Sequence, residues 1–302
     1  ENRITMKHRW SGCGTALVTP FTEAGNIDED AISRLAKRQI ENGIHFLVPC
    51  GTTGESPTLS NSEKLRVVDL VVQEADNKIP VLAGAGGYDT KSVVALAQDM
   101  VRAGVDGILS VAPYYNKPSP EGIYQHFCNV AENLDCPVMV YNVPSRTGVD
   151  MFNDTTLRLA GIDNIVGIKD ATNDLFRPLF TRTKIKKNFC YLSGEDGTAL
   201  PYLTQGGHGC ISVTANIAPK LCSDFQKFSI SKSDNEKKEA EKIDKILQPV
   251  HKSMFIESNP SPVKYAAKLL SLCDDEVRLP LVRITKKTQD EVKIALSSAK
   301  LI

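Results

Sequence analysis

The chain of 302 residues is 41% hydrophobic and carries 36 basic and 36 acidic side chains, so its formal net charge is zero. This length and apolar content suffice for one large globular domain or for two smaller ones. A neutral chain has no basic field that would indicate nucleic acid or an anionic membrane as a partner. Small metabolites are therefore the expected ligands.

The cysteines and the apolar runs indicate the cellular compartment of the protein. None of the eight cysteines belongs to a CxxC pair, and several stand in apolar runs such as FLVPC and GCISV, as buried thiols in a reducing compartment do. No run approaches the roughly 20 apolar residues of a membrane helix, and the polar start ENRITMKHRW has no signal-peptide core. We expect a cytoplasmic protein in which residues 1–11 form an N-terminal extension.

Short β-branched segments alternate with helical patterns along the chain. Residues 28–43, for example, have an apolar face with a helical period and end at Gly43. Eight β/α units of about 30 residues, with near-continuous apolar strands, predict an α/β fold, a parallel (β/α)8 TIM barrel rather than an open sheet. The strand segments are 14–21, 45–50, 80–86, 107–113, 137–144, 165–171, 189–195 and 209–216.

The barrel units end near residue 230, so we expect residues 12–230 to form the catalytic barrel. No low-complexity linker follows them. The rest of the chain, residues 231–302, therefore predicts a helical region packed on the barrel rather than a second catalytic domain. Its helical stretches, separated by proline or polar breaks, are 231–255, 259–273 and 288–302.

The sixth strand segment, IVGIKDA, holds a lysine inside an apolar run. A buried ammonium group costs several kcal/mol unless it is paired or gives up its proton. Strand alternation puts Lys169 on the same side as Ile165 and Gly167, and the glycine would leave an open layer beside the lysine stem. A neutral lysine can attack a ketone and form a Schiff base. An ion pair with a carboxylate at the barrel rim is the structural alternative.

The active site of a (β/α)8 barrel lies at the C-terminal ends of the strands, and three more polar stretches fall there. GTTGES, with Thr52 and Thr53, follows the second strand, PYYNKP follows the fourth, and YNVPSRTG, with Tyr141 and Arg146, follows the fifth. Each of these features also has an ordinary explanation. GTTGES could be only a tight turn, Tyr141 a core tyrosine and Arg146 a solvated surface arginine. Their convergence on the rim that carries Lys169 favours a functional site.

Cofactor motifs are incomplete. GAGGYD lacks the full GxGxxG spacing of a dinucleotide-binding loop, and no acidic residue is placed to bind a ribose. The five histidines have no metal-ligand spacing. The sequence therefore predicts neither a nucleotide cofactor nor a metal.

The chain resembles the 4-hydroxy-tetrahydrodipicolinate synthases, the dihydrodipicolinate synthases of lysine biosynthesis. The resemblance covers residues 12–300, and its motifs occur in the same order and spacing: GTTGES, PYYNKPSPEG, YNVPSRTG, IVGIKDAT, LSGED, GCISVTAN and NPSPVKYA. It implies a lyase that condenses pyruvate with aspartate 4-semialdehyde through a lysine Schiff base, without metal or organic cofactor.

The resemblance also implies catalytic roles. Lys169 would form the Schiff base with pyruvate, while Tyr141 and Thr53 would relay protons together with Tyr115, which would reach in from a neighbouring subunit. A phenol of pKa about 10 needs such hydrogen bonds to act as acid and base. Because the relay would cross an interface, we expect an obligate homo-oligomer, most simply a homotetramer built as a dimer of dimers.

Four residues are implied in substrate binding. Thr52 would help to hold the pyruvate carboxylate, and Gly194 and Ile211 would lie near the bound substrate. The planar fork of Arg146 suits a carboxylate, which aspartate semialdehyde carries at the end remote from its aldehyde. Sialic acid and keto-sugar-acid lyases share the lysine and the tyrosine but lack this arginine. Such an aldolase, or a non-catalytic keto-acid-binding barrel, remains the alternative.

One departure from the family concerns regulation. Lysine-inhibited relatives bind the amino acid with a histidine after the GTTGES turn and with an asparagine and a glutamate after the third strand. The matching segments here offer Asn61, Lys64, Tyr88 and Ser92, while Tyr114 remains. A cation at Lys64 and no carboxylate at Ser92 disfavour a ligand with two ammonium groups. We therefore expect weak or absent inhibition by lysine.

Overall fold

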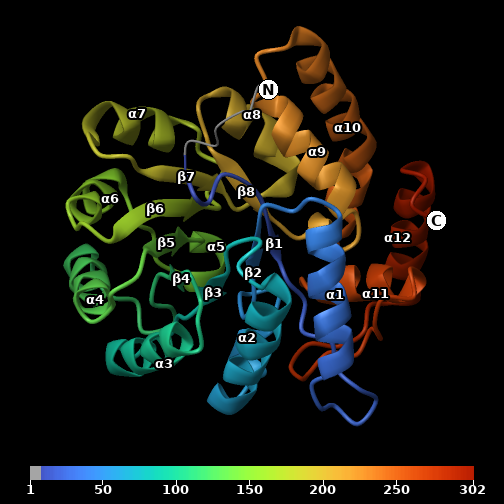
Figure 1. The fold of residues 1–302 in the computed structure, drawn as a ribbon, viewed down its shortest axis with the longest axis horizontal. Coiled ribbons are helices and arrows are strands. Elements are labelled where there is room, and N and C mark those ends of the chain that lie inside the picture. The colour runs from blue at the N-terminus through green and yellow to red at the C-terminus, as the bar shows by residue number, and fades with distance from the viewer. Residues whose placement is uncertain (1–7) are drawn as a thin grey trace.

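Eight parallel strands form a barrel at the centre of the molecule (Figure 1). The computed structural model describes residues 8–302, so the first seven residues of the expected extension lie outside it. The two ends of the sheet meet where the Leu47 N–H donates to the Pro80 carbonyl at 3.0 Å. The hydrogen-bonded order is β2 (Phe46–Val48), β1 (Gly12–Ala16), β8 (Gly209–Ser212), β7 (Cys190–Ser193), β6 (Ile165–Asp170), β5 (Val138–Asn142), β4 (Gly107–Val111) and β3 (Leu82–Gly84).

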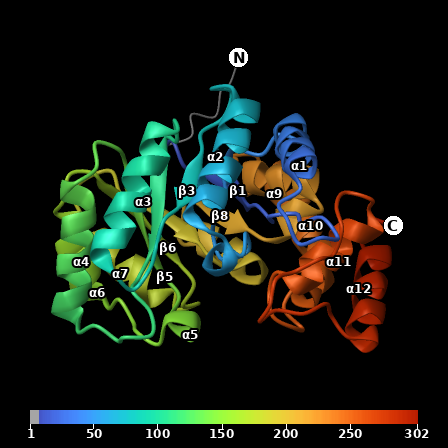
Figure 2. The same cartoon turned by 90° about the horizontal axis from the view of Figure 1, so that it is seen from below.

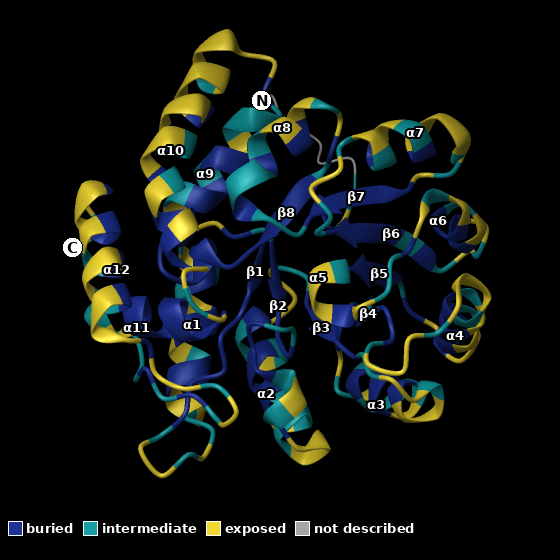
Figure 3. Cartoon of the chain, turned by 180° about the vertical axis from the view of Figure 1, so that it is seen from behind, coloured by how far each residue is buried: buried dark blue, intermediate teal, exposed yellow. Residues whose placement is uncertain are grey.

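Helices surround the barrel and bury one face each, while their outer faces are exposed (Figure 3). Side chains of Asp28, Ser60, Asp89 and Ser119 cap the first four long helices by accepting backbone N–H bonds. Between residues 8 and 302, no helix is long and apolar enough to cross a bilayer. The barrel helices are α1 (Glu29–Glu41), α2 (Asn61–Ala75), α3 (Thr90–Arg102), α4 (Pro120–Glu132), α5 (Pro144–Thr147), α6 (Asn153–Ala160), α7 (Phe176–Lys184), α8 (Ala199–Thr204) and α9 (Pro219–Ser229), with 3-10 turns η1 (Ser56–Thr58), η2 (Asp196–Thr198) and η3 (Thr214–Asn216).

The TIM-barrel prediction and all eight strand segments are confirmed, although the first strand starts at Gly12 instead of residue 14. Strand side chains alternate between the barrel interior and a layer beneath the helices, so the strands are buried on both faces, as near-continuous apolar sequences predict. Trp10, within the segment expected to be an extension, packs in the interior with its ring centroid 5.7 Å from that of Phe46.

A bulge interrupts the alternation in β6. Two successive residues of β5 pair with Ile165 and Gly167, so Val166 has no counterpart. Ile165 therefore packs beneath the helices while Val166 contacts the interior, and the prediction that Ile165 shares the side of Lys169 was wrong. A Cβ on Gly167 would lie 2.3 Å from the Cys190 carbonyl oxygen, so this glycine permits close approach of β7 and does not leave an open layer.

Three further helices lie beside α1 and α9 on one side of the barrel (Figures 1 and 2). They pack through a separate apolar cluster, in which Val250 and Val263 join Val18 and Ile217 from the barrel. Their helical character agrees with the sequence, and the boundary at residue 230 stays a prediction. They are α10 (Asp234–Ser253), α11 (Ser261–Leu269) and α12 (Lys286–Ser298).

A buried ion pair connects this C-terminal region to the loop after β2. The Lys264 Nζ lies 2.5 Å from Glu55 Oε2, and the two side chains are 0% and 1% exposed. Lys264 also donates to the Glu276 carbonyl at 2.8 Å, and the Arg278 N–H donates to Glu55 Oε1 at 3.0 Å. Burial lowers the pKa of Lys264, and the Glu55 carboxylate opposes that shift. Removing one partner of a buried pair costs about 3–5 kcal/mol because the other charge stays buried and unpaired, so substitution of either residue should weaken the contact between the loop and the C-terminal region.

Candidate active site

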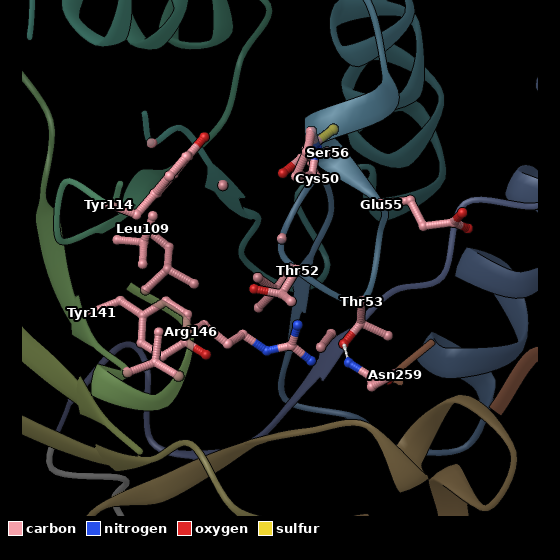
Figure 4. Close-up of a pocket in the computed structure, with 18 of the residues that line it drawn as sticks. Cys50, Thr52, Thr53, Glu55, Ser56, Leu109, Tyr114, Tyr141, Arg146 and Asn259 are labelled. Carbon is pink, nitrogen blue, oxygen red and sulfur yellow. Dashed lines mark hydrogen bonds between the residues drawn. The ribbon is translucent and has the colours of Figure 1, made fainter. Parts of the chain in front are cut away.

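A cavity of about 320 Å³ lies at the C-terminal end of the strands (Figure 4). Its walls come from the loop after β2, from β4, β5 and β6, from α5, and from the C-terminal region. Its position is the one at which (β/α)8 barrels build their active sites. The polar side chains of its lining include those of Thr52, Thr53, Tyr141, Arg146, Lys169 and Asn259.

Lys169 and Tyr141 occupy directly opposite positions on the neighbouring strands β6 and β5. Each residue is 7% exposed, and the Lys169 Nζ lies 3.9 Å from the centroid of the Tyr141 ring. An aromatic face attracts a positive charge at this distance. No ion pair involving Lys169 occurs among residues 8–302. The alternative, an ion pair of Lys169 with a carboxylate at the barrel rim, is therefore not seen in the described chain. Lys169 is thus a buried amine that faces the cavity.

The loop after β2 brings two threonines to the cavity. Thr52 is half-buried, whereas Thr53 is 3% exposed and its Oγ1 accepts a hydrogen bond of 2.9 Å from Asn259 Nδ2 (Figure 4). The turn closes through a 3.0 Å bond from the Glu55 N–H to the Thr52 carbonyl, and Glu55 adopts a left-handed φ of 55°. The buried pair of Glu55 with Lys264 holds this unfavourable conformation in place.

Arg146 reaches the cavity from the opposite wall. It lies on α5, a single turn that ends at Gly148 with a φ of 74°. The left-handed conformation at Gly148 terminates the turn and keeps the arginine next to the end of β5. In Figure 4 the side chain extends toward the loop of Thr52 and Thr53. Its guanidinium group can therefore offer two parallel N–H donors to a carboxylate inside the cavity.

The remaining three site residues lie outside the cavity lining. Gly194 adjoins the lysine, because a Cβ there would lie 3.2 Å from Lys169 Cε. Ile211 is buried in the barrel interior, in the cluster that contains Tyr141. Tyr115, with a φ of 71°, is 86% exposed, and Tyr114 lines the cavity in its place. The single chain therefore gathers five of the eight expected residues at one cavity and leaves the Tyr115 side chain on the surface.

Two lining residues had no assigned role in the sequence. Asn259 stands in the NPSPVKYA motif, but its position beside Thr53 depends on a contact across 206 residues. Cys50 lines the cavity as a buried thiol, and burial raises its pKa to about 12. A thiol with so high a pKa stays protonated and is a poor nucleophile, which leaves Lys169 as the nucleophile best placed in the cavity.

Comparisons with known proteins show the family of the chain. Residues 9–299 match the sequence profile of the dihydrodipicolinate synthetase family. The 4-hydroxy-tetrahydrodipicolinate synthase of Pelagibacter ubique is 53% identical over 293 residues, which cover 97% of this chain and 100% of that protein.

Solved structures of dihydrodipicolinate synthases have the same fold as this chain. The chloride-inhibited dihydrodipicolinate synthase of Acinetobacter baumannii, complexed with pyruvate, has a TM-score of 0.93 at 40% identity over 97% of this chain and 99% of that one. The enzyme of Cyanidioschyzon merolae with lysine bound has a TM-score of 0.94 at 34% identity over 98% and 100% of the two chains. The chain belongs to the dihydrodipicolinate synthetase family.

Proposed function

We propose that the chain condenses pyruvate with L-aspartate 4-semialdehyde to give 4-hydroxy-tetrahydrodipicolinate, a lyase reaction of diaminopimelate and lysine biosynthesis. The Pelagibacter relative carries the name of this enzyme, and the Acinetobacter neighbour was solved with pyruvate. One observation carries the proposal for this chain. The buried amine of Lys169 faces the cavity, 3.9 Å from the Tyr141 ring centroid, and has no ion-pair partner in the described chain.

The proposed chemistry starts at Lys169. Its Nζ attacks the ketone carbon of pyruvate, and loss of water gives an iminium ion. The iminium withdraws electrons from the adjacent methyl group, which loses a proton to give an enamine. The enamine carbon then attacks the aldehyde of the second substrate and forms the new C–C bond. Finally, the amino group of that substrate attacks the imine carbon, releases Lys169 and closes the ring, with a net loss of one water molecule.

The other residues have supporting roles in this proposal. Tyr141 and Thr53 transfer protons between the reacting atoms and solvent, together with a Tyr115 side chain from a second subunit. Thr52 holds the pyruvate carboxylate, and Arg146 binds the carboxylate of the semialdehyde through two parallel hydrogen bonds. The aromatic face of Tyr141 stabilises the positive charge of the iminium that forms on Lys169.

We also propose that the protein is a homo-oligomer, with a dimer of dimers as the finer prediction. Tyr115 supports this proposal, because its side chain is 86% exposed and does not line the cavity of its own chain. Further exposed apolar side chains are Phe152, which precedes α6, and Phe176 and Leu179 on α7. Two separate self-association surfaces are what dihedral assembly requires.

A coupled assay tests the proposed function. Pyruvate and aspartate semialdehyde are supplied with an excess of dihydrodipicolinate reductase, which consumes NADPH as product forms. We expect loss of NADPH absorbance that depends on both substrates and on the protein. If there is no turnover, the sugar-acid aldolase and the silent keto-acid-binding barrel become the working hypotheses, and trapping of a pyruvate adduct with borohydride separates those two.

We expect L-lysine to inhibit the protein weakly or not at all. Lys64 is half-buried near the start of α2, where burial lowers its pKa, and Tyr88 packs edge-on against Tyr114 with centroids 5.5 Å apart. The Ser92 hydroxyl is bonded to Asp89, the residue that caps α3. Asp89 is a carboxylate at this position, and its bonds to Ser92 and to the start of α3 make it less available to a second ammonium group.

A titration of the coupled assay with L-lysine at neutral pH measures the inhibition. L-Norleucine, which has no ε-ammonium group, is the control at matched ionic strength. We expect the two curves to coincide, whereas submillimolar inhibition by lysine alone would contradict the prediction.

A further inference from the structure

The loop that carries Arg146 is closed at its base by one side chain. Asn142, the last residue of β5, is 1% exposed and uses both atoms of its side-chain amide. Its Oδ1 accepts a hydrogen bond of 3.1 Å from the Met151 N–H, and its Nδ2 donates to Asp150 Oδ1 at 2.9 Å. These two bonds tie the end of the loop, residues 143–150, to its beginning.

An arginine of α7 holds the same end of the loop from outside. Arg177 donates from its two Nη atoms to the two carboxylate oxygens of Asp150, at 2.6 and 2.8 Å. The side chains are 20% and 23% exposed, so solvent screens this pair less than a pair on the open surface. Hydrogen bonding to Arg177 lowers the pKa of Asp150, which therefore stays ionised. Two parallel bonds fix the direction of the carboxylate as well as its distance.

The loop is stiff between these contacts. Its single helical turn is closed by a 3.0 Å bond from the Gly148 N–H to the Pro144 carbonyl, and the buried Thr147 hydroxyl donates to the Val149 carbonyl at 2.9 Å. The guanidinium group of Arg146 itself makes no hydrogen bond or ion pair within residues 8–302. The contacts at the base of the loop therefore decide where this guanidinium group points.

We propose that Arg177 is a positioning residue for substrate binding, which acts through Asp150 and keeps the Arg146 fork directed into the cavity. A helix on the outside of the barrel thereby sets the affinity for the second substrate. The inference rests on the proposed function, in which Arg146 binds the carboxylate of aspartate semialdehyde. In the ordinary alternative, the Arg177–Asp150 pair only attaches α7 to the barrel.

Substitution of Arg177 separates these explanations through the two substrates. For Arg177→Met, which keeps an apolar stem without the fork, we expect kcat/KM for aspartate semialdehyde to fall about 10-fold. The kcat/KM for pyruvate and the yield of borohydride-trapped pyruvate adduct should stay within about twofold of the wild type. Equal losses for both substrates, or no loss for the semialdehyde, would overturn the inference.

Two milder variants keep the test available if Arg177→Met does not fold. Arg177→Lys keeps the charge without the planar fork, and Asp150→Asn keeps the shape of the side chain without its charge. For both we expect a loss of kcat/KM for aspartate semialdehyde smaller than that of Arg177→Met, again with little effect on pyruvate. Wild-type values in both would contradict a positioning role.

A double-mutant cycle shows whether Arg177 acts through Arg146. In the Arg146→Ala background, Arg177→Met should cause no further loss of kcat/KM for aspartate semialdehyde, because the group that it positions is absent. Additive losses would overturn the inference.

Arg66 provides the matched control. It donates to the two carboxylate oxygens of Glu29 at 2.9 and 2.7 Å, and this pair joins α2 to α1 outside the cavity lining. Arg66→Met should leave the kinetic constants for both substrates unchanged. If it lowered kcat/KM for the semialdehyde as much as Arg177→Met does, loss of any such pair would suffice and the inference would fail.

The readouts also distinguish this inference from the proposed function. A wild-type protein that traps no pyruvate adduct, or an Arg146→Ala variant with wild-type kinetics, contradicts the proposed function. A trapped adduct and an impaired Arg146→Ala variant, together with unchanged kinetics in Arg177→Met, contradict the positioning role alone.

Discussion

Replacing Lys169 with alanine will lower turnover by about 10⁴-fold or more, because the variant has no amine that can form the iminium ion. The fold should persist, since the lysine is in no ion pair of the described chain and alanine fits a buried strand position. The coupled assay measures the loss of turnover. Mass spectrometry after borohydride reduction with pyruvate should find a pyruvyl adduct on the wild type and none on the variant.

Lys187→Ala is the matched control for this experiment. Lys187 is partly buried, and its Nζ donates to the Ile162 carbonyl at 2.5 Å, away from the cavity. We expect this variant to form the adduct and to turn over as the wild type does. Lys169→Arg should be as inactive as Lys169→Ala, because it keeps the charge without a nucleophilic amine. Wild-type turnover in either Lys169 variant would rule out Schiff-base catalysis at this residue.

Replacing Arg146 with alanine will lower kcat/KM for aspartate semialdehyde by about 100-fold, which corresponds to about 3 kcal/mol for a charged, bidentate hydrogen bond. Pyruvate should be affected little, because its carboxylate is assigned to Thr52, so the trapped adduct still forms. For Arg146→Lys, kcat/KM for aspartate semialdehyde should lie between the values of the wild type and Arg146→Ala, since an ammonium group keeps the charge but loses the planar fork. Varying each substrate in turn in the coupled assay measures the effect on aspartate semialdehyde and the effect on pyruvate separately.

Arg158 supplies the control for this second experiment. Its guanidinium pairs with Glu121 at 2.6 Å and lies over the Tyr124 ring, both outside the cavity lining. Arg158→Ala should leave both kinetic constants unchanged. If Arg146→Ala kept near wild-type activity, the arginine would not bind the second substrate, and the distinction from sugar-acid aldolases would lose its basis.

The barrel could be predicted because its signal is local. Each strand is an apolar, β-branched run, and each long helix has an apolar face with its own cap, so alternation of the two is visible in the sequence. Lys169, Tyr141, Thr52, Thr53 and Arg146 could be grouped for a related reason. All five follow or end strands, and parallel strands of one barrel deliver their C-terminal ends to the same rim.

Features that depend on pairing between distant segments could not be predicted. The bulge at Val166 shifts the alternation of β6 by one residue, and a period of two cannot reveal it. Asn259 and Lys264 meet the loop after β2 only because the C-terminal region folds back on the barrel. Sequence order carries no information about that contact, so neither residue had a predicted partner.

The attachment of the C-terminal region to the loop after β2 also sets an order of events during synthesis. Thr53 leaves the ribosome 206 residues before its partner Asn259, a delay of roughly 10–40 s at 5–20 residues per second. Throughout that interval Glu55 has no Lys264 to neutralise it, and a carboxylate without a partner stays in water. We therefore expect this loop to stay open in a nascent barrel and to close over the cavity only after the C-terminal region has been made.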